Sequence, residues 1–163
     1  MPEIYTKRKL IILISLVVVS LVFIVILGGS LFFSKSKNQK VKAMVGSKII
    51  QVEIASTTKD QIKGLSGRKF LEEDSGMLFD FNDYQVRTFW MKDMNFPIDI
   101  IWISEGKIVG VDKNLPPEGN NPQKKYYSPG PVNRVLEMNA GWFDRNEIMV
   151  GQAFSLIDVD KNF

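Results

Sequence analysis

The longest apolar run in the chain stands close to its start and sets the first limit on the fold. From Leu10 to Leu27, 18 residues are interrupted only by Ser15 and Ser20. As a helix this run is about 27 Å long, which is close to the hydrocarbon thickness of a bilayer. We therefore predict a transmembrane anchor over residues 10–33, which leaves the rest of the chain for one folded domain.

The segments on either side of this anchor are polar. Residues 1–9 form a short tail, residues 34–42 form a lysine-rich linker, and residues 43–163 are enough for a single domain of ordinary size. A cleaved signal peptide is the competing interpretation, because residues 7–9 are basic and residues 28–30 are small. The apolar regions of signal peptides run only about 7 to 15 residues, however, and no Ala-x-Ala site follows here, so the sequence favours an uncleaved anchor.

The basic residues around the anchor do not determine its orientation. Three precede the apolar run and four lysines follow it up to residue 42, so the positive-inside count is balanced. Short N-terminal tails usually stay in the cytoplasm. We therefore predict a single-pass plasma-membrane protein with residues 1–9 inside and an extracytoplasmic domain.

The net charge of +3 belongs to these flanks and not to the domain. Of 21 basic and 18 acidic residues, six basic and one acidic lie at or before Lys40, which leaves 15 basic and 17 acidic residues, a net of −2. A nucleic-acid partner is therefore not expected. The chain has neither Cys nor His, which excludes thiol and imidazole catalysis, and its glycines show no phosphate-binding spacing. We predict no metal and no cofactor.

Beyond residue 41 the pattern changes to short alternating runs that are typical of β-strands. A hairpin is expected around Gly46 and Ser47, and a short helix is expected to begin near Thr57 and to end by Gly64 or Gly67. The run after Pro97 is apolar almost throughout, which predicts a strand buried on both faces. The expected strands are 43–45, 48–55, 76–81, 85–91, 98–103, 107–111, 132–138 and 153–159, with a long loop over 114–131 and a turn or short helix over 140–146.

Several groups of residues together resemble the prokaryotic domain of unknown function 192 family. The resemblance covers Ala55 to Gly151, and it rests on Gly64-Leu65 with Arg68, Gly76-Met77-Leu78-Phe79, Phe89-Trp90-Met91-Lys92, Pro97-Ile98-Asp99-Ile100, Val135-Leu136-Glu137, Gly141 and Gly151. It implies an α+β fold that is mainly β, an open barrel-like antiparallel sheet with one or two short helices, often membrane-tethered. It implies no established activity. The chain departs from the family pattern at Asp93-Met94, where Asn-Thr is common, and at Ser66, where Met is often found.

Candidate site residues gather in the segment FWMKDMNFPIDIIWI, which places charge among aromatic side chains. Lys92, Asp93 and Asp99 could share a partly desolvated cleft, where burial would strengthen their coupling. In the structural alternative, Asp99 accepts hydrogen bonds from loop backbone and Lys92 lays its stem over aromatic surface. Arg68 and Glu137 could pair with each other or help to fix an anionic ligand.

Two functions from different classes fit these residues. The first is a binding or accessory module that recognises an envelope component or a partner protein through the cleft around Lys92 and Asp99. The alternative is a His-free hydrolase acting on a glycan, with Asp93 and Asp99 as acid and base at about 5 to 9.5 Å. A dyad of Ser66 and Lys92 is a third chemical possibility. Aromatic residues, Trp90 among them, could stack on a sugar, although strand aromatics more often belong to a core.

Overall fold

The computed structural model describes residue 15 and residues 40–157. The predicted tail and almost all of the predicted anchor and linker lie outside the described residues, as do residues 158–163. Within the described part of the chain, no helix is both long and apolar enough to cross a membrane. The chain divides into two units, residues 1–37 and residues 38–163, and the second contains the β-rich domain.

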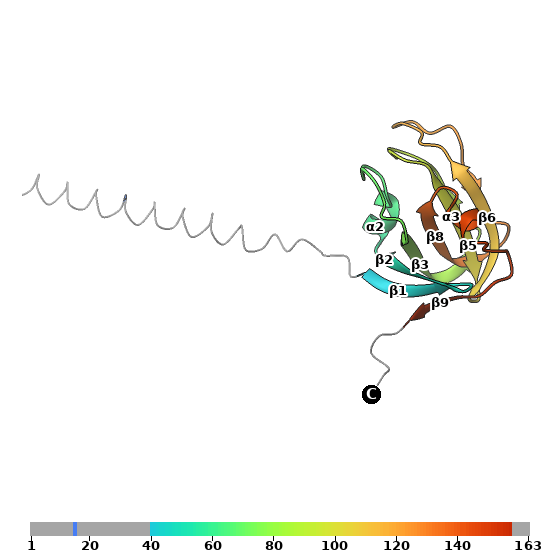
Figure 1. Ribbon diagram of the computed structural model, residues 1–163. Helices are drawn as coiled ribbons and strands as arrows, with labels where there is room; N and C mark the ends of the chain where they lie inside the picture. The colour runs from blue at the N-terminus through green and yellow to red at the C-terminus, as the bar shows by residue number, and fades with distance from the viewer. Residues whose placement is uncertain (1–14, 16–39, 158–163) are drawn as a thin grey trace, which may run out of the picture. The chain divides into compact units, whose positions relative to one another are not determined.

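The domain is a seven-stranded sheet that curls into a half-barrel, together with a two-stranded ribbon and two short helices (Figure 1). The strand order in the large sheet is β6-β5-β8-β3-β2-β1-β9, and β4 pairs with β7 in the ribbon. The elements are β1 Lys40–Val45, β2 Lys48–Ala55, α2 Thr58–Lys63, β3 Ser75–Gln85, β4 Thr88–Phe89, β5 Ile98–Ser104, β6 Lys107–Leu115, β7 Tyr126–Tyr127, β8 Val132–Asn139, α3 Trp142–Arg145 and β9 Phe154–Ile157.

Two pairings define how the sheet bends and closes. β2 and β3 are parallel, with α2 in the crossover between them, whereas the family resemblance implied an antiparallel sheet. The two outermost strands approach each other at one end, where Ile108 N–H donates to the Gln152 carbonyl at 2.9 Å and Phe154 N–H donates to the Gly106 carbonyl at 2.8 Å. These bonds join the two edges of the curled sheet at that end.

Local sequence signals explain the first elements. The predicted hairpin is confirmed, although β1 begins at Lys40 instead of residue 43. The predicted short helix is confirmed as α2: the Thr57 side chain accepts a hydrogen bond from Asp60 N–H at 3.2 Å, and Gly64 ends the helix with a positive φ of 49°.

The segments around the long loop differ from the prediction. The strand expected over 85–91 is reduced to the two residues of β4, which pair with the two residues of β7, and Gln85 belongs to β3 instead. β6 extends to Leu115, and β7 lies within the region expected to be an unstructured loop. Backbone bonds tie the rest of this loop down: Glu118 N–H donates to the Met91 carbonyl at 3.0 Å, and Asp93 N–H donates to the Gly119 carbonyl at 3.1 Å.

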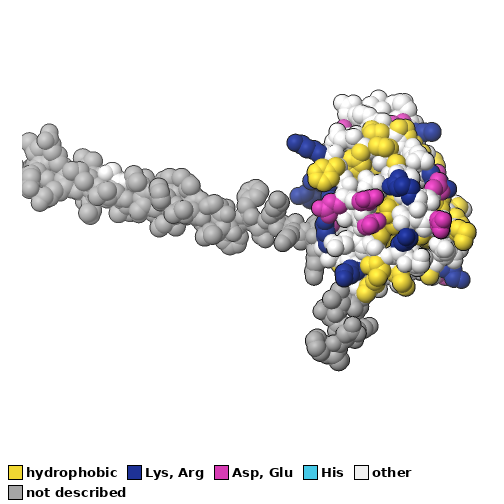
Figure 2. Space-filling model, in the orientation of Figure 1, with side chains coloured by type: hydrophobic (Ala, Val, Ile, Leu, Met, Phe, Trp, Pro, Cys, Tyr) yellow, Lys and Arg dark blue, Asp and Glu magenta, His cyan; other side chains and the backbone are white. Residues whose placement is uncertain are grey.

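Two hydrophobic clusters fill the opposite faces of the central strands. Along β5, Ile101 and Ile103 belong to one cluster while Ile100 and Trp102 belong to the other, so the predicted burial on both faces is confirmed. The first cluster includes Trp142 and Phe143 of α3, and the second includes Phe79, Met91 and Tyr126. On the outer surface in view in Figure 2, acidic and basic side chains are interspersed with apolar ones.

Candidate functional site

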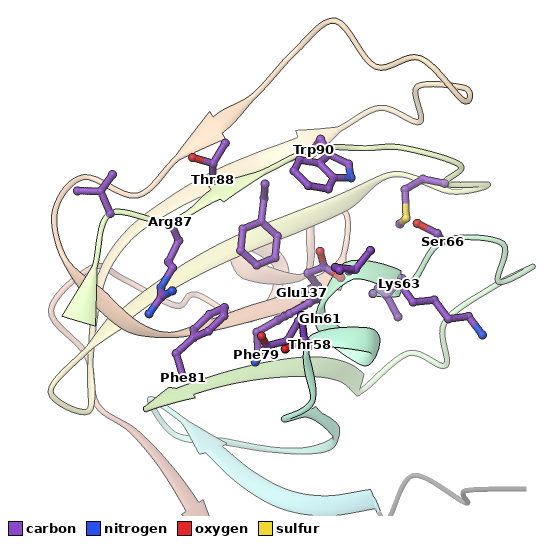
Figure 3. Close-up of a pocket in the computed structure, with 16 residues that line it drawn as sticks. Thr58, Gln61, Lys63, Ser66, Phe79, Phe81, Arg87, Thr88, Trp90 and Glu137 are labelled. Carbon is purple, nitrogen blue, oxygen red and sulfur yellow. The ribbon is translucent and has the colours of Figure 1, made fainter. Parts of the chain in front are cut away.

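A pocket of about 300 Å³ lies between α2 and the segment that joins β3 to β4 (Figure 3). Four aromatic residues stand in its apolar wall, and they are Phe79, Phe81, Phe89 and Trp90. Phe79 and Phe89 meet edge to face with ring centroids 4.8 Å apart, which fixes the inner wall. Trp90 stands at the rim with 43% of its surface exposed.

Glu137 is the buried polar group of this pocket. It belongs to β8, where Leu136 and Met138 point to the first cluster, so the Glu137 side chain points to the opposite face. Figure 3 shows the carboxyl facing into the pocket, with Phe79 on one side and Trp90 on the other. Only 5% of the residue is exposed, and its Oε2 atom has no hydrogen-bond partner.

This environment changes the acidity of the carboxyl. Burial raises the pKa of Glu137 to about 8, and the positive charge of Arg68 opposes that rise only in part. At neutral pH most Glu137 side chains therefore carry a proton. A neutral carboxyl can donate one hydrogen bond and accept others, whereas an ionised carboxylate only accepts.

The space beside the carboxyl depends on a glycine. Gly64 ends α2 in the left-handed region, which few other residues adopt without strain. A Cβ atom at this position would lie 3.3 Å from Cζ of Phe79 and 3.8 Å from Oε2 of Glu137. The same residue that terminates the helix therefore keeps the pocket open next to its polar group.

Arg87 provides a second charged group in the pocket wall. Its Nη2 atom donates to the Asp83 carbonyl at 3.0 Å and also to the Asp83 carboxylate. The guanidinium carbon lies 3.8 Å from the ring centroid of Phe81, which is a cation–π contact. Nε of Arg87 is buried without a partner. Arg87 is thus paired with Asp83, while its Nε–H group has no hydrogen-bond acceptor.

Arg68 does not pair with Glu137. Its guanidinium forms a bidentate ion pair with Glu53, at 2.7 Å for each of the two bonds. The hydrogen bond to Glu53 is the main cause that raises the pKa of Arg68 above its ordinary value. Of the alternatives open for Arg68, the structural ion pair is the one observed, although Glu53 and not Glu137 is its partner.

For Asp99 the structure contradicts the ligand-binding role and confirms the structural alternative, in which the side chain accepts hydrogen bonds from backbone. This residue is fully buried, and its oxygens accept three backbone hydrogen bonds: Oδ1 from Asn114 at 2.8 Å and Gly141 at 3.1 Å, and Oδ2 from Phe143 at 3.1 Å. No oxygen is exposed to a ligand, so Asp99 joins the start of α3 to the end of β6. The hydrolase that uses Asp93 and Asp99 as acid and base is wrong, because Asp99 cannot reach a substrate.

Lys92 and Asp93 are exposed in the segment between β4 and β5, and their side chains do not line the pocket. The backbone carbonyl of Lys92 accepts the Ser66 hydroxyl at 2.7 Å. Asp93 takes a positive φ of 53°, and its carbonyl accepts Gly67 N–H at 2.8 Å. The Ser66 hydroxyl proton is therefore given to a carbonyl oxygen, which does not support the Ser66 and Lys92 dyad.

The sequence contained a partial signal for the observed site. The sequence indicates Glu137 as a possible ion-pair partner. Its carboxyl lies within an apolar strand, where charged side chains are rarely buried unless they are paired. Trp90 was considered for stacking, and it is the exposed tryptophan, whereas Trp102 and Trp142 are 1% exposed core residues. Phe79, Phe81 and Gln61 were missed, because only the folded chain brings them beside Glu137. Among residues 15 and 40–157, no three acidic side chains are grouped so as to hold a metal ion.

Comparisons with known proteins agree with this architecture. The model of the family DUF192, described as "Uncharacterized ACR", matches residues 40–156. A protein of Sinorhizobium meliloti 1021, described as a suggested transcription regulator, has a solved structure with 30% identity and a TM-score of 0.65, over 72% of this chain and 92% of that one. A protein of unknown function from Novosphingobium aromaticivorans DSM 12444 has 30% identity and a TM-score of 0.67, over 75% and 89%. A search of curated proteins found no match.

Proposed function

The chain belongs to the DUF192 family, and on that premise we propose that its domain is a binding module whose ligand enters the pocket around Glu137. One observation carries the proposal: a carboxyl that is 5% exposed faces an aromatic pocket with an oxygen that has no partner. A buried polar atom without a partner costs about 1 to 3 kcal/mol. A ligand that supplies the partner recovers that free energy, so the pocket favours an occupant.

The size and chemistry of the pocket support a small group over a large surface. Ligand pockets commonly measure about 300 to 1,000 Å³ and combine apolar walls with a few polar groups. Here the volume of about 300 Å³ suits one ring or a short chain of a larger molecule. The occupant is then a small ligand or one projecting group of an envelope component or partner protein.

The expected location of the module is part of the proposal. Residues 10–33 would anchor the protein in the plasma membrane, with residues 1–9 in the cytoplasm, residues 34–42 as a linker and the domain outside the cytoplasm. The apolar run supports the anchor, and the shortness of the N-terminal tail supports the outward orientation of the domain. Protease added to intact cells should digest the domain; digestion that requires opening the cells would refute the outward orientation.

Binding to nucleic acid is not proposed. From residue 41 onward the chain has 15 basic and 17 acidic residues, and the surface in view in Figure 2 shows no basic stripe. Affinity for a phosphate backbone depends on concentrated positive charge.

The binding proposal can be tested with a spectroscopic probe inside the pocket. The chain has three tryptophans, so the full chain labelled with 5-fluorotryptophan gives one ¹⁹F signal for each, and Trp90→Phe assigns the pocket signal. The full chain would be held in nanodiscs of phosphatidylglycerol. This lipid was chosen because it carries no amine and no sugar that could compete for the pocket. Members of a fragment library should shift the Trp90 signal saturably while that of Trp142, in the other cluster, stays fixed. A library in which no fragment moves the Trp90 signal alone would refute the proposal.

A further inference from the structure

The unpartnered carboxyl and the aromatic walls together define the chemical class of the occupant. Resting on the binding function above, we propose that the pocket takes a cationic amine carried by an apolar body, with the ammonium donating a hydrogen bond to Oε2 of Glu137.

The first argument is the charge balance of the pocket. Arg87 is paired with Asp83, and Arg68 is paired with Glu53. Lys63, the remaining cation of the lining, is exposed at the rim. Among the residues that the structure describes, Glu137 is thus the buried ionisable group of the pocket that has no ion-pair partner. A cation that enters the pocket meets a carboxyl that can become its counter-ion.

The second argument is the nature of the walls. The faces of aromatic rings attract cations, most strongly when the cation is held away from water. Phe81 already carries the guanidinium of Arg87 against its ring, so the pocket accommodates this kind of contact. Trp90 presents the largest aromatic surface at the rim and is only half covered. An ammonium that passes Trp90 would meet aromatic surface on its way to Glu137.

Other ligand classes use the pocket less fully. A neutral hydroxyl would form one hydrogen bond with Glu137 and would gain nothing from charge. An anion would have to lie beside a carboxyl that must then remain protonated, and the guanidinium of Arg87 is already engaged by Asp83. A charge-assisted hydrogen bond is roughly twice as strong as a neutral one. Of the three ligand classes, the amine is therefore the one that the buried oxygen of Glu137 should bind most strongly.

Binding of the amine should release a proton. Since burial raises the pKa of Glu137 to about 8, the free pocket is mostly protonated at neutral pH. The ammonium keeps its three protons, the carboxyl loses one to solvent, and the bound state contains a carboxylate and an ammonium. The other charged side chains in or near the pocket are those of Arg68, Glu53, Arg87 and Lys63. The affinity for the amine should then rise about tenfold per pH unit below about pH 8 and level off above it.

Three matched probes test the class of ligand: phenethylamine, phenethyl alcohol and 3-phenylpropanoate. They would be titrated against the fluorotryptophan-labelled full chain in phosphatidylglycerol nanodiscs, with the Trp90 signal as readout, at about pH 6, 7 and 8. We expect the amine to bind at least about tenfold more tightly than the alcohol at about pH 8, and only the amine to gain affinity as the pH rises. Calorimetry at about pH 7, in phosphate and in MOPS, should show release of nearly one proton for each amine bound.

Glu137→Gln is the matched variant, because it keeps the shape of the side chain and removes its charge. The variant should bind the amine and the alcohol with similar affinity, without pH dependence or proton release. Unchanged ¹⁹F signals from Trp102 and Trp142 would verify its fold. Since the pH dependence and the proton release are measured on the unmodified chain, the test holds even if the variant does not fold.

The possible outcomes separate this inference from the binding function. If the alcohol or the acid shifts the Trp90 signal at concentrations as low as the amine does, the pocket binds ligands but the inference about amines is wrong. If the amine binds tightest but releases no proton, its nitrogen does not meet Glu137 and the inference also fails. If no probe moves the Trp90 signal and the fragment library does not either, the binding function itself is wrong.

Discussion

The substitution Glu137→Gln should make the stability of the domain less dependent on pH. Burial raises the pKa of Glu137 to about 8, from an ordinary value of 4.5. Because the pKa is higher in the folded state, the protonated carboxyl contributes stability that is fully present below about pH 4.5 and is lost as the pH rises through about 8. Glutamine does not titrate, so in the variant this position contributes nothing to the change of the unfolding free energy with pH.

The size of the effect follows from one proton. Between the two pKa values the folded chain binds one proton more than the unfolded chain at this position, so the free energy of unfolding falls by about 1.4 kcal/mol per pH unit. From about pH 5.5 to 7.5 the loss is about 2.7 kcal/mol, a large part of the 5 to 15 kcal/mol that is typical of a domain. The chain has no His, so no other side chain with an ordinary pKa titrates in this interval.

Urea unfolding of the full chain in nanodiscs, followed by the near-ultraviolet circular dichroism of the buried tryptophans, would measure this slope. The unfolding free energy of the unmodified chain, less that of Glu137→Gln, should fall by about 1.4 kcal/mol per pH unit. The variant can be more or less stable than the unmodified chain at any one pH. Only the dependence of the unfolding free energy on pH tests the prediction. Parallel pH profiles would mean that the carboxyl is already ionised in the folded state, with Arg68 as its stabilising charge, and proton release on amine binding would then be ruled out as well.

Three further substitutions test the packing around the site. Asp99→Asn should lower the free energy of unfolding by about 2 to 4 kcal/mol in urea titrations, because one amide oxygen cannot serve three backbone donors; an unchanged midpoint would contradict the structural role of the carboxylate. Gly76→Ala should lower it by about 1 to 3 kcal/mol in thermal unfolding, since the added Cβ would lie 2.5 Å from Sδ of Met138 and 2.8 Å from the Glu137 carbonyl oxygen; Gly119→Ala, at a position with open space, separates crowding from the general effect of adding a methyl group. Thr57→Ala should cost about 1 kcal/mol and speed hydrogen exchange in the first turn of α2, whereas unchanged exchange there would show that the cap contributes nothing.

The sequence predicted those elements whose stability depends on their own residues. The β1–β2 hairpin has its turn residues in place, α2 has both of its caps, and β5 is apolar except at Asp99 and Ser104. The prediction was wrong where a partner decides the structure. β4 consists of the two residues that pair with β7, and β2 and β3 are parallel, with α2 in the crossover between them. Such pairings depend on residues distant in the chain, which periodicity does not reveal.

The candidate site shows the same division. That Glu137 and Arg68 are unusual could be seen from their strand and turn contexts, but the partner of Arg68 is Glu53, which lies 15 residues away in β2. Lys92 drew attention as a charge among aromatic residues, yet its side chain is exposed and its backbone carbonyl makes the observed contact with Ser66. Sequence reasoning identified residues with an uncommon chemistry. The residues that contact them, which determine their role, could be identified only in the folded structure.

Among residues 40–157, the two buried carboxyls illustrate how a structural acid differs from a candidate functional one. Asp99 and Glu137 both lie in central strands among apolar side chains. Asp99 has three backbone donors directed at its two oxygens, so the folded chain already supplies all that an ionised carboxylate requires. Glu137 has a distant positive charge, an oxygen without a partner and a pocket beside it. Folding alone would favour an apolar residue at position 137, since a buried polar group without a partner is destabilising. The carboxyl is best explained by an occupant of the pocket that supplies the missing partner.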